Sequence, residues 1–252
     1  MSHLNLGFRY REGKQYEKAI QHYRRVVEIR PDYFWGHYNA GVCYLALRQY
    51  DAAVGEFQQA YNTYSNAFEN AVGLGDAYKA KQDYAEAERW YRTAVGKAPN
   101  EIVPHLALGE LLVARGRFDE AAEEFAAAEK LKPDSVDVSR RYGRALLDAG
   151  RFAEAAPQLE RWAAAEPDNA QSHIDLSSCY YSLSKFALAE QQGAEAVRLA
   201  PQMFEARNNY ALALAAVGRS AQVREQFDSA LQLLPPGSPA AEQIRKAINA
   251  LR

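Results

Sequence analysis

One ten-residue phrase recurs seven times along this 252-residue chain, each time 34 residues after the previous copy and without any insertion. Its clearest copies read GRFDEAAEEF and GRFAEAAPQL. The copies begin at Lys14, Arg48, Gln82, Gly116, Gly150, Ser184 and Gly218. A fixed period of this length is typical of a protein made of one supersecondary unit stacked on its neighbours. Such an array grows lengthwise and needs no single central core, so repetition overrides the chain length as a guide to domain number.

The period has positions of fixed character, numbered here so that position 1 falls at Phe34 and position 8 at Gly41. Position 8 is small in every copy and position 20 is alanine in six of the seven, while position 24 is mostly aromatic. Glycine near position 15 suits the end of one helix, and the proline at position 32 ends another. The pattern therefore predicts two antiparallel helices per repeat, each marginal in isolation and stabilised by stacking.

These positions resemble the tetratricopeptide repeat family, and the resemblance covers Met1 to about Gly237. It implies an all-α fold, a right-handed α-solenoid (the tetratricopeptide superhelix) of seven helix pairs. The repeats are expected at approximately 1–33, 34–67, 68–101, 102–135, 136–169, 170–203 and 204–237. Residues 238–252 are expected to form a C-terminal capping helix, with one apolar face made by Ala241, Ile244, Ala247, Ile248 and Leu251.

Met1 falls at position 2 of the first repeat, so the chain is expected to start inside a helix. Either this repeat lacks an N-terminal cap or the chain is a piece of something longer, and we expect the second. An uncovered first repeat also makes self-association possible. In the fifth and sixth repeats, we hypothesise that Trp162 fills the space that Gly193 leaves at position 24.

The bulk properties exclude several kinds of partner. The net charge of −2 offers no basic field for nucleic acid, and RNA binding would also need stacked aromatic side chains in a basic groove. No apolar run approaches the roughly 18 residues of a membrane span. The N-terminus does not read as a signal peptide. A cytoplasmic location is the expectation, or a periplasmic one if an upstream signal was removed.

The sequence contains no pattern of residues that predicts a catalytic site or a metal site. His3, His37, His105 and His173 all occupy position 4, so whole repeats separate them, and packing is a better interpretation than a metal site. Cys43 and Cys179 lie four repeats apart and cannot form a disulfide. We find no nucleophile beside a base and no glycine-rich phosphate loop. We therefore predict no catalytic residue, no cofactor and no metal, and a protein that is not an enzyme.

The resemblance implies instead that the first helices line a concave groove that receives a peptide or a partner protein. Its lining comes chiefly from positions 2, 5, 6, 9, 12 and 13. In the first two repeats these positions are apolar and aromatic, which is typical of binding anchors. The candidate residues there are Asn5, Phe8, Trp35, Tyr38, Asn39 and Val42. The alternative is that Trp35 and Tyr38 merely shield the end of the array.

Farther along, the groove positions become charged. Asp76 and Glu110 are acidic, and Arg140, Arg141 and Arg144 form a cluster that could hold a carboxylate. The alternative, which we favour, is pairing within the chain to Asp137, Asp148 or Asp175.

Position 6 is where members of the family often use asparagine to hold a peptide backbone. It carries Asn5, Asn39 and Asn209, but Asp175 and Arg141 replace the amide in two repeats. The lysine and asparagine code of the members that bind chaperone tails is matched only at Asn39, so that ligand is not expected. The predicted function is a protein-interaction scaffold or adaptor. The alternative is a substrate-recruiting arm of a larger enzyme, such as a glycosyltransferase, whose catalytic domain is absent from this chain.

Overall fold

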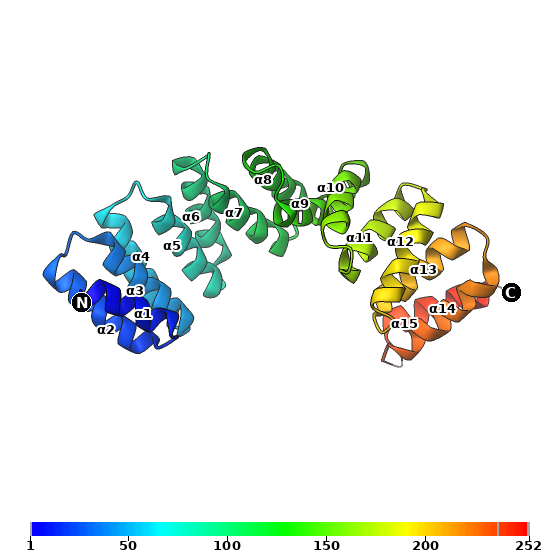
Figure 1. Ribbon diagram of the computed structural model, residues 1–252, viewed down its shortest axis with the longest axis horizontal. Helices are drawn as coiled ribbons and strands as arrows, with labels where there is room; N and C mark the ends of the chain where they lie inside the picture. Colours follow the sequence, from blue (N-terminus) through cyan, green and yellow to red (C-terminus); the bar gives the residue numbers. More distant parts are fainter. Residues whose placement is uncertain (1, 236, 251–252) are drawn as a thin grey trace. The chain divides into compact units, whose positions relative to one another are not determined.

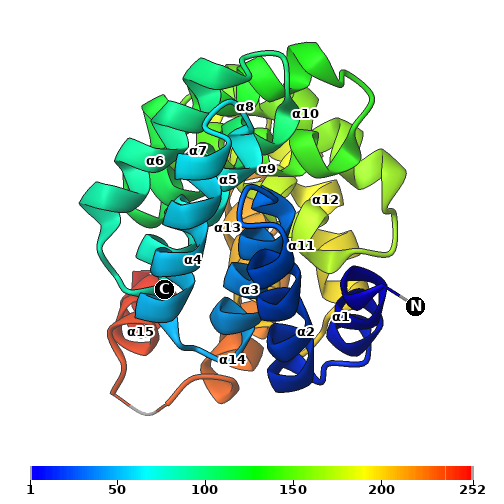
Figure 2. The same cartoon turned by 90° about the vertical axis from the view of Figure 1, so that its left-hand side faces the viewer.

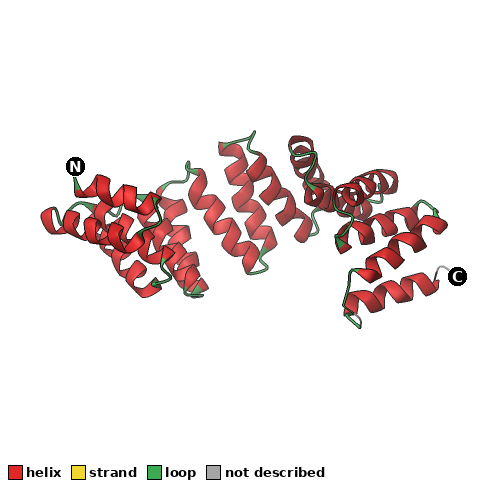
Figure 3. Cartoon of the chain, turned by 60° about the horizontal axis from the view of Figure 1, so that its bottom comes forward, coloured by secondary structure: helices red, strands yellow, loops and turns green. Residues whose placement is uncertain are grey.

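The computed structural model describes residues 2–235 and 237–250, which contain fifteen α-helices and no strand (Figures 1 and 3). Consecutive helices pack as pairs, and the all-α class with seven helix pairs and a C-terminal helix is confirmed. Met1, which the sequence placed in the first repeat, and Leu251, which it placed on the apolar face of the last helix, lie outside the described residues.

The first helices of the pairs are α1 (His3–Glu12), α3 (Phe34–Ala46), α5 (Phe68–Ala80), α7 (Ile102–Ala114), α9 (Val136–Asp148), α11 (Ala170–Ser182) and α13 (Phe204–Ala216). The second helices are α2 (Tyr16–Ile29), α4 (Tyr50–Thr63), α6 (Tyr84–Lys97), α8 (Phe118–Leu131), α10 (Phe152–Ala165), α12 (Phe186–Leu199) and α14 (Ser220–Gln232). The last helix is α15 (Pro239–Ala250). Helix α1 begins at His3, and Ser2 caps it, because its side-chain oxygen accepts a hydrogen bond from the backbone N–H of Asn5. The expectation that the chain starts inside a helix is therefore wrong, and the first repeat has an N-terminal cap.

A left-handed residue ends the first helix of every pair, at the first residue of the recurring phrase. Three of these residues are glycines, such as Gly116 with φ +70°, as the pattern predicted. The following N–H then returns to a carbonyl inside the helix, as from Arg117 to Leu112 at 2.9 Å. The other four repeats hold the same conformation without glycine, at Lys14, Arg48, Gln82 and Ser184.

The small residue at position 8 makes room for a ring rather than for a bare backbone. A Cβ atom added to Gly75 would lie 2.4 Å from Tyr91 Cε1, and one added to Gly109 would lie 2.6 Å from Phe125 Cε1. Both rings stand at position 24 of the same repeat and are almost completely buried. Positions 8 and 24 are therefore complementary in volume, which keeps the two helices of a pair in register.

The sixth repeat breaks this rule in a way that corrects our hypothesis about Trp162. The atoms nearest to a Cβ added at Gly193 belong to Tyr210 and Ser177, the closest being the Tyr210 Cα at 2.9 Å. The backbone of α13 thus lies directly against Gly193, where a side chain at this position would begin. Trp162 contributes none of these nearest atoms, and its indole instead donates a hydrogen bond to Glu166 at 2.9 Å.

The chain divides into two compact units, one ending at Pro133 and the other beginning at Asp134. In the first unit, α3 packs against both α2 and α4 (Figure 2). One buried cluster runs from Ala19 on α2 to Ala94 on α6. In the second unit, α15 packs on α14 and buries Ala241 and Ile244, as its apolar face predicted. The core of each unit therefore extends from repeat to repeat.

Candidate partner-binding site

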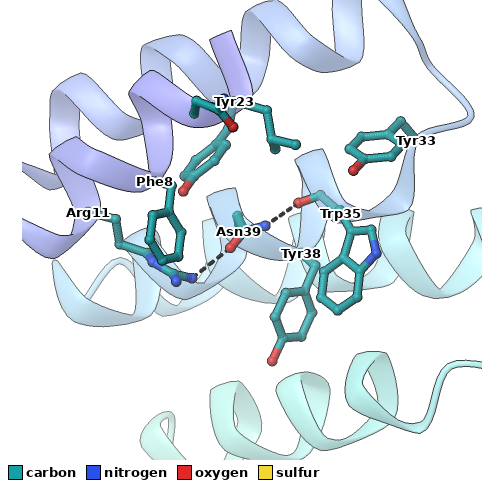
Figure 4. A pocket seen from close by; sticks show the side chains of 9 residues that line it. Phe8, Arg11, Tyr23, Tyr33, Trp35, Tyr38 and Asn39 are labelled. Atoms are coloured by element: carbon teal, nitrogen blue, oxygen red, sulfur yellow. Dashed lines mark hydrogen bonds between the residues drawn. The ribbon is translucent and has the colours of Figure 1, made fainter. Parts of the chain in front are cut away.

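The first unit contains a cavity of about 450 Å³ between α1, α2 and α3, which we call the α1–α3 cavity (Figure 4). Five residues that the sequence predicted for partner binding line it, namely Asn5, Phe8, Trp35, Tyr38 and Asn39. Leu4, Arg11, Tyr23 and Tyr33 complete the lining. Helices α1 and α3, the first helices of their pairs, supply most of the lining. Positions 2, 5, 6 and 9 project from the same side of a helix, so they reach the cavity together.

Exposed aromatic side chains dominate the cavity. Phe8 is 46% exposed and Trp35 is 37% exposed, although both are large and apolar. The Trp35 and Tyr38 rings meet edge to face with their centroids 5.4 Å apart, and Tyr38 in turn packs edge to face on the buried ring of Phe57. Trp35 is thus held in place by its neighbours while one side of it stays open to solvent.

A chain of hydrogen bonds crosses the cavity (Figure 4). The Arg11 guanidinium donates from Nη1 to Asn39 Oδ1 at 2.6 Å, and Asn39 Nδ2 donates to the Trp35 carbonyl at 2.7 Å. The guanidinium carbon also lies 5.0 Å from the centre of the Phe8 ring. Asn39 was expected to hold a peptide backbone, but both ends of its amide have partners within the chain.

Tyr23 is a lining residue that sequence reasoning missed. Position 24 predicted a packing ring, and the ring does cover Gly7, but its hydroxyl is buried without a hydrogen-bond partner. Burial raises the pKa of Tyr23 to about 12, and the nearby charge of Arg11 acts in the opposite direction. Arg11 is also a lining residue that was not among the predicted site residues. It stands at position 12, one of the groove positions, and that position could have identified it from the sequence.

The other candidates of the first unit lie outside the α1–α3 cavity. Val42 is half-buried against the core of α2 to α6. Asp76 accepts a hydrogen bond from the Tyr91 hydroxyl at 2.5 Å and lies 3.8 Å from Lys79 Nζ. Burial raises the pKa of the Asp76 carboxyl, although the Tyr91 bond and Lys79 act to lower it. Glu110 is half-buried on α7.

In the second unit the arginine cluster is engaged by carboxylates of the chain, as the favoured alternative predicted. Arg140 and Arg141 both pair with Asp137, the latter at 2.9 Å. Arg144 Nε lies 3.1 Å from the buried Asp175 carboxylate. Burial raises the pKa of Asp175, and the Gln171 hydrogen bond at 2.6 Å and the charge of Arg144 partly offset this effect.

A second cavity of about 450 Å³ includes part of this cluster. Its lining residues are Asp137, Arg140, Arg144, Trp162, Glu166, Asn169 and Gln171. The lining contains two arginines and two acids, so its formal charge is zero. Hydrogen bonds from Trp162 and Asn169 hold the pKa of Glu166 below its usual value. Asn209 lies elsewhere, where its amide donates to the Ile174 carbonyl at 3.3 Å.

The position-4 histidines join the two helices of a pair. His37 Nδ1 lies 2.8 Å from Glu56 Oε2, and His105 Nδ1 lies 2.7 Å from Glu124 Oε2. His173 makes the equivalent contact to Gln192 at 2.7 Å. Within residues 2–235 and 237–250, no three histidine, cysteine or acidic side chains come together to hold a metal ion. In the same residues, no helix is both long enough and apolar enough to span a bilayer.

The fold and its site define a helical-repeat protein whose first helices present an aromatic cavity. Models of the tetratricopeptide repeat match residues 38–102, 106–170, 143–204 and 205–229, and a TPR repeat model matches residues 7–48. The chain belongs to the tetratricopeptide repeat family. This fold is typical of protein-interaction scaffolds and is generally non-catalytic.

Solved structures of the same fold are similar to this chain. The C-terminal part of a TPR repeat-containing protein from Cytophaga hutchinsonii aligns with 96% of this chain and 98% of its own, at 14% identity and a TM-score of 0.75. YrrB, described as a TPR protein with an unusual peptide-binding site, aligns with 73% of this chain and 95% of its own, at 18% identity and a TM-score of 0.66. MamA from Desulfovibrio magneticus RS-1 aligns with 66% of this chain and 94% of its own, at 21% identity and a TM-score of 0.62. No curated protein matches the sequence significantly.

Proposed function

We propose that this chain is a protein-interaction scaffold or adaptor that binds a peptide segment of a partner in the α1–α3 cavity. The observation that carries the proposal is the set of exposed aromatic side chains around that cavity, above all Trp35 and Phe8. Large apolar side chains that stay exposed beside a hollow are typical of binding surfaces. Tryptophan and tyrosine contribute most often to the few contacts that dominate binding energy.

The rigidity of the cavity supports this role. Tyr38 is fixed between Trp35 and Phe57, and Asn39 is bonded at both ends, so little conformational freedom remains to be lost when a ligand binds. A volume of about 450 Å³ suits individual side chains of an extended or helical segment rather than a flat protein surface. YrrB, which shares the fold, is described as having a peptide-binding site.

The arginine cluster of the second unit is a weaker candidate. Its three guanidinium groups already face Asp137 and Asp175, so an acidic ligand would have to compete with these carboxylates. Charge selectivity from Arg140, Arg141 and Arg144 would therefore be small. We place the main affinity in the first unit.

The proposal is tested by selecting ligands directly on the purified protein. A random library of linear twelve-residue peptides is panned on the full chain, on Trp35→Ala and on Ile29→Ala. Ile29 is 61% exposed and lies outside the cavity lining, so it controls for the loss of an exposed apolar side chain. Peptides enriched on the full chain should bind Ile29→Ala equally well and Trp35→Ala about 30-fold more weakly, since a central tryptophan contributes ~2 kcal/mol or more.

Two results would reject the proposal. One is that no peptide is enriched over an unrelated protein. The other is that the enriched peptides bind Trp35→Ala as tightly as they bind the unchanged chain, which would place their site elsewhere.

A further inference from the structure

Arg11 differs from the other cations at the groove positions in the kind of group that it contacts. Four other cations occupy these positions, and each faces a carboxylate of the chain. They are Lys79 with Asp76, Arg140 and Arg141 with Asp137, and Arg144 with Asp175. In the part of the chain that the structure describes, Arg11 instead bonds to the neutral amide oxygen of Asn39. Arg11 is the one charged residue in the lining of the α1–α3 cavity. Carboxylates outside the lining also act electrostatically on it, Glu12 on Tyr23 and Asp76 and Glu69 on Tyr38.

The Arg11 guanidinium is fixed in position by its contacts, but most of its N–H donors are not used in the bond to Asn39. It is bonded to Asn39 at 2.6 Å, and Asn39 is in turn fixed to the Trp35 carbonyl. The face of the guanidinium lies over the Phe8 ring. An arginine has five N–H donors in a planar fork, and only one is used in the bond to Asn39. A carboxylate could accept from the remaining donors without moving the side chain.

The Tyr23 hydroxyl is a second, independent sign of a missing acceptor. Tyr23 is 1% exposed, it lines the cavity, and its oxygen has no hydrogen-bond partner. Figure 4 shows its ring extending from α2 toward Phe8. Buried hydroxyl groups are nearly always hydrogen-bonded, because an unsatisfied one destabilises the fold. The same position holds phenylalanine at Phe57, Phe125 and Phe227, so packing alone does not require an oxygen there.

We propose that the α1–α3 cavity selects a carboxylate that lies next to an apolar side chain, with Arg11 and Tyr23 as the donors that recognise it. The apolar side chain would contact Phe8, Trp35 and Tyr38, and the carboxylate would complete the hydrogen bonding of the two donors. This inference rests on the proposed function and adds the chemistry of the ligand. Two sources supply such a group: an aspartate or glutamate side chain, and the C-terminal carboxylate of the partner.

The arrangement differs from the lysine and asparagine code of chaperone-tail binding. That code needs a lysine at position 5 and an asparagine at position 9, where this chain has Leu4 and Phe8. Here the donors come from position 12 of the first helix and position 24 of the second. The apolar side chains thus occupy the places that polar groups hold in that code.

The experiment uses the peptides recovered in the selection above. Each is synthesised in three forms: with a free C-terminus, with a C-terminal amide, and with its aspartates and glutamates changed to asparagine and glutamine. Their affinities are measured by calorimetry on the unchanged chain, on Arg11→Gln, on Tyr23→Phe and on Arg25→Gln. The Arg25→Gln control removes one positive charge from the same repeat. Arg25 itself pairs with Glu28 and does not line the cavity.

One neutralised form should bind the unchanged chain about 10- to 100-fold more weakly, since hydrogen bonds to charged groups are worth roughly that factor. Whether this form is the amide or the side-chain replacement identifies the source of the carboxylate. Arg11→Gln should weaken the acidic form to the level of the neutralised form and leave the latter unchanged. Tyr23→Phe should weaken the acidic form several-fold and leave the melting temperature equal or higher, because a buried hydroxyl without a partner has been removed.

The inference is overturned if all three forms bind alike, or if Arg11→Gln and Arg25→Gln have the same effect. It is also overturned if Arg11→Gln weakens the acidic and neutralised forms equally. In each of these cases the dependence on Trp35 would still stand, so the proposed function would survive. Loss of the Trp35 dependence itself would reject the proposed function instead.

Discussion

At the scale of single residues, position 15 adopts the same left-handed backbone conformation in all seven repeats, whether or not the residue is glycine. Gly116, Gly150 and Gly218 adopt it with little strain, because they have no Cβ. Gln82, with φ +64°, adopts it against a preference of roughly 1–2 kcal/mol for right-handed backbone. The tight turn is therefore imposed by the packing of the two helices that it joins, and glycine is an aid rather than a requirement.

The strained turns give a prediction about stability. Gln82→Gly should raise the free energy of unfolding by about 0.5–1 kcal/mol, because the relief of strain exceeds the added entropy of the unfolded chain. Gly116→Ala should lower it by about 1 kcal/mol for the opposite reason. Urea denaturation followed by circular dichroism measures both changes. Gln82→Ala keeps the strain and removes the side chain, and a gain in stability equal to that of Gln82→Gly would show that the backbone is not the cause.

At the scale of elements, each helix pair depends on the match between a small residue and a ring. Gly75→Ala would place a methyl group 2.4 Å from the Tyr91 ring, whose hydroxyl also bonds Asp76. We expect a loss of about 1–3 kcal/mol in the free energy of unfolding, the usual penalty for overpacking. Gly55→Ala on α4 meets no atom within 4 Å and should instead stabilise the protein by about 1 kcal/mol. Thermal unfolding of the two variants tests this, and equal shifts would contradict the role of the ring.

The helices were predictable from sequence because each repeat restates the same constraints. Glycine at position 15 and proline at position 32 mark the helix ends, and α4 ends at Thr63 although Ser65 replaces the proline. Position 24 predicted a buried ring wherever one is present. At Gly193 the period could not show the close approach of α13, because that contact depends on Tyr210 of the following repeat.

The candidate site was predictable only in part. Positions 2, 5, 6 and 9 led to Trp35, Tyr38, Asn39 and Phe8, because groove positions follow from helix geometry. For Tyr23 the period predicts only a packing residue, since nothing in it shows that a buried hydroxyl lacks an acceptor. Pairing of Arg144 with Asp175 could be considered from sequence, but the choice between internal pairing and ligand binding required their distance.

At the scale of the whole molecule, the division at Pro133 separates the α1–α3 cavity and its supporting core from the second unit. The buried cluster beneath the cavity runs through α2 to α6, and α7 and α8 complete the fourth pair. In a repeat array, stability is close to a sum of repeats and neighbouring interfaces. Residues 1–133 should therefore carry both the fold and the binding activity of the first unit.

This leads to a prediction about the isolated unit. Residues 1–133 expressed alone should be helical, unfold cooperatively, and bind the selected peptides within about threefold of the full chain, a difference of less than ~0.7 kcal/mol. Residues 134–252 should not bind them. Circular dichroism measures the helix content and the unfolding, and calorimetry measures the peptide affinity. A chain ending at Gly116 is the matched control. This control lacks α8, which packs against α7 in the full chain, so it should be less stable than 1–133. A folded 1–133 that has lost the peptides would mean that the second unit contributes to binding, and would refute the assignment of the site to the first unit.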